Sequence, residues 1–174
     1  MNANVREMRL DEVGIVIEYF HGATPEYLET LGVDPTRLPE RAVWHEQFAA
    51  EFANPIESRP RLMVMWELDG QPVGFSSADK ITIGVQANMH LHVVEPDLRR
   101  QGVGETCVRK TARLYFDALR VQRLFCEPNA FNVAPNRTLQ RAGFAYVKTH
   151  NTVPAALNFH QPVTRWILER PADV

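Results

Sequence analysis

Two arginines and two glycines stand close together in the segment EPDLRRQGVG, residues 95–104. An apolar run precedes this segment, and helical periodicity begins at its end. The first turn of a helix presents unpaired N–H groups and the positive end of the helix dipole, which both favour an anion. Gly102 and Gly104 lack the Cβ atom that would keep an anion from the backbone, and Arg99 and Arg100 supply charge suited to phosphate oxygens. The pattern predicts a phosphate, in particular a pyrophosphate, at this turn; the alternative is a solvated loop with a helix cap.

Two common phosphate-binding motifs do not fit this spacing. A dinucleotide-binding turn needs a third glycine where the chain has Cys107. A P-loop needs Gly-Lys-Ser/Thr four residues after its first glycine, and the segment lacks this run. Both nucleotide-binding folds are therefore disfavoured.

Composition predicts one soluble globular domain over residues 1–174, since 45% of the residues are hydrophobic and 23% are charged. The 19 basic and 21 acidic residues give a net charge of −2, so no overall field favours nucleic acid or a membrane surface. The amino-terminal residues lack the order of a signal peptide, and we expect a cytoplasmic protein. Cys107 and Cys126 lack the spacing of a disulfide or metal site, and no metal is expected.

Hydrophobic periodicity predicts the elements that must hold the turn. Thr24 is a candidate helix cap with Pro25 behind it, Gly32 a helix stop, and Asp69-Gly70 a hairpin turn. From Gly102 the period changes from two to 3.6, which indicates a long amphipathic helix. We predict strands over 4–9, 61–68, 72–80, 87–95, 121–128, 144–150 and 163–170, and helices over 10–22, 24–32, after Pro39, after Gly102 and over 132–143.

The turn resembles motif A of the GNAT superfamily of N-acetyltransferases, which has Arg/Gln-x-x-Gly-x-Gly/Ala after a strand. Arg99, Gly102 and Gly104 match it. The segment NVAPNRTLQRAGF is similar to the run N-x-A-S-x-R-V-L-x-K-x-G-F of the subgroup that contains the ribosomal-protein N-acetyltransferases. The residues that agree are Asn132, Ala134, Arg137, Leu139, Gly143 and Phe144.

The predicted order of elements is also that of the GNAT fold. The resemblance implies an α/β (α+β) domain with a central mixed, mostly antiparallel sheet of about seven strands. The sheet would be splayed between strands four and five and flanked by about four helices.

The resemblance implies acetyl-coenzyme A as cofactor. The turn carried by Arg99, Arg100, Gln101, Gly102, Val103, Gly104 and Glu105 would bind the pyrophosphate. The backbone of His92, Val93 and Val94 would pair with the pantetheine like an added strand. Asn132 matches an asparagine near the thiol end of the cofactor, although it is also a candidate helix N-cap.

The implied reaction is direct attack of a primary amine on the thioester, and it needs a group that accepts a proton. Alternation along residues 88–94 places His90 and His92 on one face, and His90 matches a histidine of the arylalkylamine N-acetyltransferases. Glu127 is a second candidate base, and the alternatives are a structural histidine and an ordinary strand-end carboxylate. Many GNAT enzymes have a tyrosine acid where this chain has Leu139, so the acid is not assigned.

The leading hypothesis is a cytoplasmic N-acetyltransferase whose acceptor is a small-molecule amine or a protein amino terminus. The segments 22–60 and 150–162 would wall the acceptor site, with Asn158 and His160 as candidate contacts. The family also makes a homodimer a reasonable expectation. The alternative from another class is a non-catalytic module that binds or senses acyl-coenzyme A.

Overall fold

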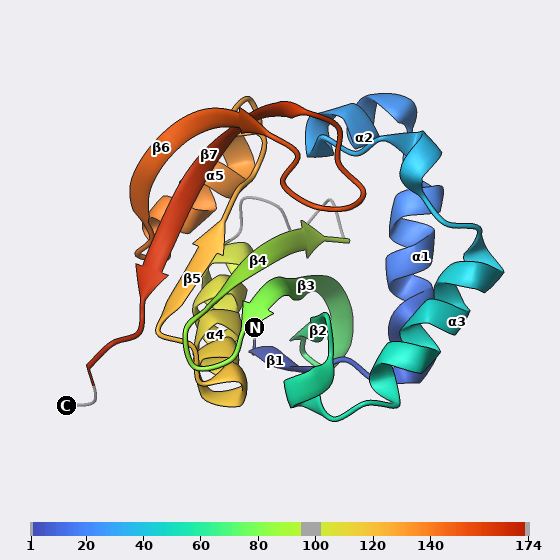
Figure 1. Ribbon diagram of the computed structural model, residues 1–174, viewed down its shortest axis with the longest axis horizontal. Helices are drawn as coiled ribbons and strands as arrows, with labels where there is room; N and C mark the ends of the chain where they lie inside the picture. The colour runs from blue at the N-terminus through green and yellow to red at the C-terminus, as the bar shows by residue number, and fades with distance from the viewer. Residues whose placement is uncertain (1, 95–101, 173–174) are drawn as a thin grey trace.

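The computed structural model describes residues 2–94 and 102–172. Seven strands, five α-helices and three short 3-10 helices form in these two ranges (Figure 1). Their order is β1 (Ala3–Glu7), η1 (Leu10–Glu12), α1 (Val13–His21), α2 (Pro25–Leu31), η2 (Pro35–Arg37), α3 (Arg41–Phe52), η3 (Ile56–Ser58), β2 (Leu62–Leu68), β3 (Gln71–Thr82), β4 (Gln86–Val93), α4 (Val103–Leu119), β5 (Arg123–Cys126), α5 (Val133–Arg141), β6 (Ala145–Thr152) and β7 (Gln161–Glu169).

All seven strands belong to one sheet with the order β1-β2-β3-β4-β5-β7-β6. Only the pair β4–β5 is parallel among the strand pairs of the described chain, and α4 provides the crossover between these two strands. The structure confirms the predicted mixed, mostly antiparallel sheet, and it has five α-helices where about four were expected.

The sheet opens between β4 and β5. Their pairing consists of Gln86 with Arg123, Ala87 with Leu124 and Asn88 with Phe125. Beyond Asn88, β4 continues to Val93 while β5 ends at Cys126, and the two arrows diverge in Figure 1. The predicted splay is therefore present, and it leaves a gap at the carboxyl ends of these strands.

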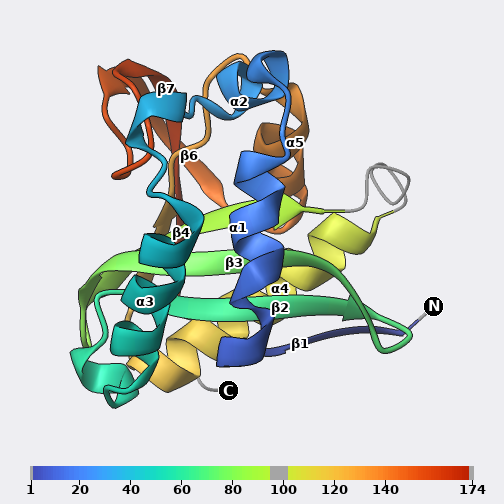
Figure 2. The same cartoon turned by 90° about the vertical axis from the view of Figure 1, so that its right-hand side faces the viewer.

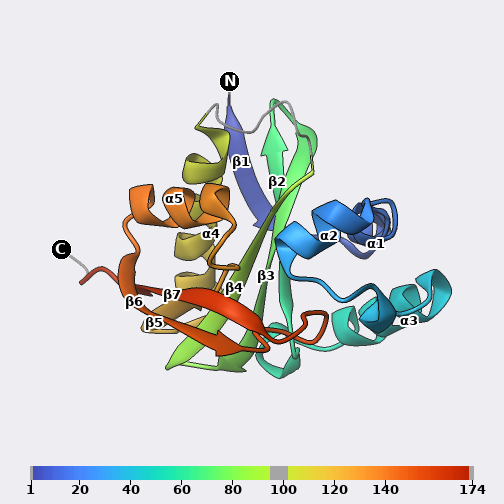
Figure 3. The same ribbon diagram turned by 90° about the horizontal axis from the view of Figure 1, so that it is seen from above.

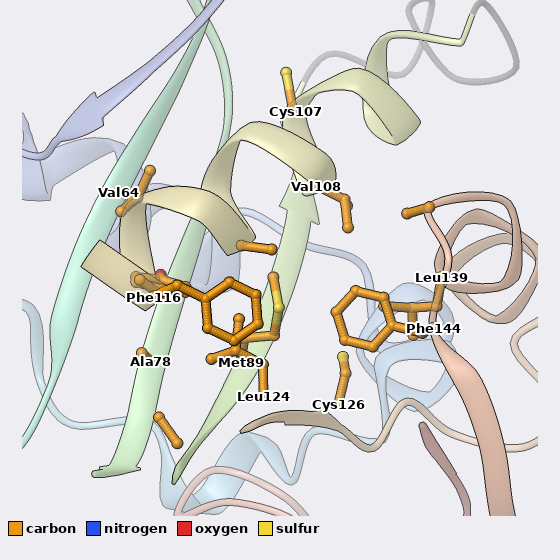
Figure 4. Packing of buried hydrophobic residues seen from close by; sticks show 14 of the residues in the cluster. Val64, Ala78, Met89, Cys107, Val108, Phe116, Leu124, Cys126, Leu139 and Phe144 are labelled. Atoms are coloured by element: carbon orange, nitrogen blue, oxygen red, sulfur yellow. The ribbon is translucent and has the colours of Figure 1, made fainter. Parts of the chain in front are cut away.

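Helices cover both faces of the sheet, with α4 and α5 on one side and α1–α3 on the other (Figure 3). On the α4 side, one face of the helix is buried against β2–β5, and Figure 4 shows Phe116 together with Met89 and Leu124 in this core. Trp66 Nε1 donates a hydrogen bond of 2.8 Å to Thr111 Oγ1, which satisfies the only polar atom of the indole. On the other side, α1 and α3 bury a second apolar cluster against β2 and β3.

The predicted caps and turns are confirmed. The hydroxyl of Thr24 accepts a hydrogen bond from the Tyr27 amide, and Gly32 ends α2 with a left-handed φ of 70°. Asp69 and Gly70 both have positive φ in the β2–β3 hairpin. None of the helices described here is long and apolar enough to cross a membrane.

Candidate active site

A cavity of about 500 Å³ lies between the sheet, the helices α1 and α3, and the loops that flank β5 and β7. His90 and His92 of β4 line it, as do Glu127 and Asn132 from the segment after β5. Four of the residues singled out in the sequence therefore meet in one cavity, at the gap between β4 and β5. Cys126 also lines it, but its side chain belongs to the α4 core, and burial raises the pKa of its thiol so that it stays protonated.

His90 and His92 lie on the same face of β4, as predicted, while Met89 packs in the α4 core on the opposite face. The side chain of His90 points to Asp79 of β3, with 3.1 Å between Nε2 and Oδ1. The two atoms are close enough for an ion pair, but the ring is not aligned for a hydrogen bond. Within the described residues neither buried atom has a hydrogen-bond partner.

Sequence reasoning did not single out Asp79. Alternation along β3 places Ser77 and Asp79 on the face that His90 occupies, and both line the cavity. The available signal was a carboxylate two residues after Ser77, in a strand whose central residues are mostly buried. Asp79 therefore joins His90 as a polar group at the sheet wall of the cavity.

His92 is enclosed by aromatic rings. Its ring stacks on Phe75 with 4.8 Å between the centroids and meets Phe20 and Tyr19 edge-on at 5.2 and 5.1 Å. Although the residue keeps some accessible surface in the cavity, burial of the ring lowers the pKa of His92 to about 3, and the neighbouring His90 adds to this effect. His92 is therefore neutral at physiological pH and part of the packing on this face.

Glu127 lies at the end of β5 with its side chain only 4% exposed. Arg165 Nη1 donates to its Oε1 at 2.9 Å, and His150 Nε2 lies 3.4 Å from the same oxygen. The guanidinium of Arg165 also lies over the Phe125 ring, 3.9 Å from its centroid. The carboxylate is thus held in an ion pair.

The segment that follows Glu127 stays beside β7. Thr164 donates to the carbonyl of Pro128 at 3.1 Å, and Ala130 donates to the carbonyl of Pro162 at 2.9 Å. This pairing holds the chain between Pro128 and Asn132 against the end of the sheet. It directs the chain across the cavity before α5 begins.

Asn132 occupies the N-cap position of α5, but among the described residues its side chain makes no capping hydrogen bond. Its Nδ2 instead donates to the carbonyl of Thr30 at 3.4 Å. Leu139, which stands where many family members have a tyrosine, is fully buried in the α4 core. It therefore presents no polar group to the cavity.

The start of α4 carries two glycines. Gly102 has a φ of 78°, and a Cβ atom built there meets no atom of the described residues within 4 Å. A Cβ at Gly104 would meet only Thr138 Cγ2, at 3.8 Å. The tip of β4 and the start of α4 lie on the same side of the molecule (Figure 2). This open glycine-bearing helix start fits a phosphate group, whereas Arg99, Arg100 and Gln101 lie outside the described residues.

The remaining cofactor candidates have roles within the fold. Val103 is buried, and Glu105 accepts a hydrogen bond of 3.2 Å from Arg109 one turn later in α4. The N–H of Val94 donates to the carbonyl of Val73 at 2.9 Å, so its amide is already used in the sheet. Pairing of a ligand with the backbone of 92–94 stays a prediction.

The loop between β6 and β7 lies next to α2 (Figure 1). The carbonyl of Gly32 accepts hydrogen bonds from Asn158 Nδ2 at 2.9 Å, Gln161 Nε2 at 2.8 Å and the Phe159 amide at 3.2 Å. Residues 154–158 of this loop line the cavity, and we call this hydrogen-bonded segment the roof. His160, the other candidate contact in the loop, is exposed.

Comparison with known proteins points in one direction. The sequence profile described as "Acetyltransferase (GNAT) family" matches residues 25–144. A search of curated proteins gave no match.

Solved structures share the fold along nearly the whole chain. RimL, a ribosomal L7/L12 alpha-N-protein acetyltransferase in complex with coenzyme A, has a TM-score of 0.78 at 12% identity, covering 99% of this chain and 97% of its own. Aminoglycoside acetyltransferase AAC(6')-Ib with coenzyme A has a TM-score of 0.73 at 17% identity, with coverages of 97% and 95%. A spermidine N-acetyltransferase from Vibrio cholerae with coenzyme A and spermine has a TM-score of 0.73 at 12% identity, with coverages of 96% and 95%.

Proposed function

Because the chain belongs to the GNAT family of acetyltransferases, we propose that it transfers an acetyl group from acetyl-coenzyme A to a primary amine bound in the cavity. The observation that carries this proposal is the meeting of His90, Glu127 and Asn132 in one cavity at the gap between β4 and β5. These residues come from β4 and from the segment after β5, and the family places its reaction at this gap. The whole chain 1–174 would serve as one catalytic domain.

The proposed cofactor site runs from the start of α4 to the cavity. The pyrophosphate would bind at Arg99–Glu105, where Gly102 leaves open space, and the pantetheine would follow the backbone of His92–Val94. Asn132 would lie near its thiol end. The cofactor supplies an acetyl thioester, whose carbon–sulfur bond is exchanged for a carbon–nitrogen bond to the acceptor as free thiol is released.

His90 is the proposed proton acceptor. An acceptor amine is mostly protonated at neutral pH and must lose a proton before its nitrogen can attack. His90 offers an imidazole at the cavity wall, whereas the second candidate, Glu127, is held by Arg165 at 2.9 Å. The Oε1 atom of Glu127 is thus already engaged by the guanidinium. Since Leu139 is buried, protonation of the thiol falls to water or to another group.

A second candidate function is a module that binds acyl-coenzyme A without turnover. Two observations favour it: the buried Leu139 at the position of the usual tyrosine, and the ion pair that occupies Glu127. The acceptor is in either case a small amine or a peptide amino terminus. A homodimer and a cytoplasmic location stay predictions.

Two measurements on the purified protein test the proposal. Acetyl-coenzyme A at 100 times its dissociation constant should stabilise the fold by about 2.7 kcal/mol and raise the melting temperature, while NAD should not. Free thiol should then be released when amines are added. Cofactor binding without amine-dependent thiol release would favour the binding module, and failure to bind would reject both functions.

The variant His90→Gln separates the proton acceptor from the binding site. It should lower kcat by about 100-fold or more, because it removes the general base, and leave the cofactor-induced melting shift unchanged. His45→Gln, a change at an exposed histidine of α3, is the matched control and should keep full activity. Full turnover in His90→Gln would remove His90 from the mechanism.

A further inference from the structure

We infer that the acceptor is a small amine that carries a single positive charge on an apolar or aromatic body. This inference rests on the proposed function and narrows it. It excludes polyamines, aminoglycosides and protein amino termini as preferred acceptors. Three features of the cavity carry it: its walls, its charges and its roof.

Aromatic rings form part of the cavity wall. Phe20 of α1, Trp44 and Phe48 of α3, and Phe75 of β3 all line the cavity. Trp44 and Phe48 are stacked with 5.9 Å between their centroids, so this wall is preformed by the core. All four rings are at most 5% exposed. An apolar acceptor would therefore bury its own surface against them at about 25 cal/mol per Å², whereas a polycationic one would lose hydration there without gaining a counter-charge.

The charges inside the cavity favour one cation and not several. Two of its carboxylates already have arginine partners: Glu51 with Arg61 at 2.6 Å and Glu127 with Arg165 at 2.9 Å. Asp79 has no arginine or lysine partner within residues 2–94 and 102–172, and its buried Oδ1 faces only His90. An ammonium group placed beside Asp79 and His90 would satisfy this oxygen. Additional ammonium groups would meet carboxylates that are already neutralised.

Two guanidinium groups strengthen this preference. Arg37 and Arg61 line the same cavity. Arg61 is paired with Glu51 at 2.6 Å, and Arg37 lies 3.5 Å from Asp34. A second or third positive charge on the acceptor would therefore have to displace one of these arginines from its carboxylate. A monoamine with an apolar body avoids this conflict.

The roof limits the length of the acceptor. Its hydrogen bonds to Gly32 join the β6–β7 loop to the end of α2, and Asp34 adds a backbone bond of 2.8 Å to Leu157. Lys80 Nζ also donates to the Pro154 carbonyl at 2.7 Å. A polypeptide that continued beyond its amino group on this side would have to break the hydrogen bonds of the roof. A molecule that fits within the cavity would not.

Binding to the protein in the presence of coenzyme A tests the inference apart from turnover. By calorimetry, 2-phenylethylamine should bind at least ten-fold more tightly than spermidine, kanamycin or a tetrapeptide with a free amino terminus. The same order should hold for kcat/KM in thiol release. Tighter binding of spermidine, kanamycin or the tetrapeptide would overturn the inference even if the protein proves to be an acetyltransferase.

Asp79→Asn identifies the position of the ammonium group. It should weaken binding of 2-phenylethylamine about ten-fold or more, because the amide keeps the shape of the carboxylate but not its charge. Asp69→Asn in the β2–β3 turn makes the same chemical change outside the cavity and should have no effect. Equal affinities in the two variants would overturn the inference. If 2-phenylethylamine binds in this Asp79-dependent manner but no thiol is released, the proposed catalysis fails and the acceptor site stands.

Discussion

The two histidines of β4 point to the same face but have different surroundings. His92 lies among Phe75, Phe20 and Tyr19, and its Nδ1 is 3.4 Å from the Tyr19 hydroxyl. His90 faces a carboxylate at 3.1 Å. The aromatic enclosure opposes the charged form of the His92 imidazole. A single intervening residue, Leu91, therefore separates a histidine that packs among aromatic rings from a histidine that is a candidate general base.

The lowered pKa of His92 predicts loss of stability in acid. The unfolded chain takes up a proton near pH 6.5, whereas the folded chain does so only near pH 3. The free energy of unfolding should therefore fall as the pH drops below 6.5, by about 2 kcal/mol from this group at pH 5. His92→Phe should unfold with less pH dependence between pH 7.5 and pH 5, as measured in urea. His45→Gln should keep the original dependence, and an unchanged slope in His92→Phe would show that the ring is solvated.

At the scale of single residues, the sequence predicted that His90 and His92 share one face of their strand and that His90 and Glu127 are candidate bases. It did not predict the side chains that contact them. Alternation is a property of one strand, so it located His90 and His92 together. The partner Asp79 depends on the register of β3 against β4, in which Asp79 pairs with Asn88. The ion pair of Glu127 with Arg165 likewise depends on β5 and β7 being neighbours. Neither contact is encoded in a local pattern.

The start of α4 gives a matched test of the proposed pyrophosphate turn. Gly102 and Gly84 have similar positive φ values, 78° and 76°, and at both positions a Cβ meets nothing within 4 Å. Gly102→Val and Gly84→Val should therefore cost similar stability, about 1–3 kcal/mol. Only Gly102→Val should abolish the melting shift caused by acetyl-coenzyme A, because only its side chain would occupy the proposed phosphate site. A retained shift would place the pyrophosphate elsewhere.

The roof depends on the end of α2. A Cβ at Gly32 would lie 1.9 Å from Gln161 Oε1, and Gln161 is buried and bonded to the Gly32 carbonyl. Gly32→Ala should therefore displace Gln161 and cost roughly 1–3 kcal/mol more than Gly70→Ala, whose φ is also positive but whose Cβ site is open. Urea unfolding measures the difference. In a Gln161→Ala background the extra cost should disappear, and its persistence would mean that the collision is not its cause.

The elements themselves could be predicted closely, because their caps and periodicity are local. Thr24, Gly32 and Asp69-Gly70 all act as their types suggest. The roof could not be predicted, since it arises where segments more than 120 residues apart in sequence meet. β7 starts at Gln161, earlier than the predicted 163, because Gln161 pairs with Thr152 at the end of β6.

At the scale of the whole molecule, the sheet consists of two parts. The strands β1–β4 form one meander and β5–β7 the other part, and three residue pairs join them between β4 and β5. The helix α4 spans the junction and packs on both parts. The sequence predicted this splay only through its resemblance to the GNAT family, because strand periodicity does not reveal which strands are neighbours.

A ligand that lies in the gap between β4 and β5 should couple these two parts. If acetyl-coenzyme A contacts the backbone at 92–94 and Asn132 at the start of α5, it bridges them at the place where the sheet lacks strand pairing. Its addition should then slow amide hydrogen exchange on both sides of the gap, in 89–94 and in 123–136, whereas NAD should leave both unchanged. Gly102→Val should lose the effect on both sides together. Protection confined to the start of α4 would instead mean that the cofactor binds by its phosphates alone. The proposal that its acetyl group lies beside His90, in the gap between β4 and β5, would then lose its support.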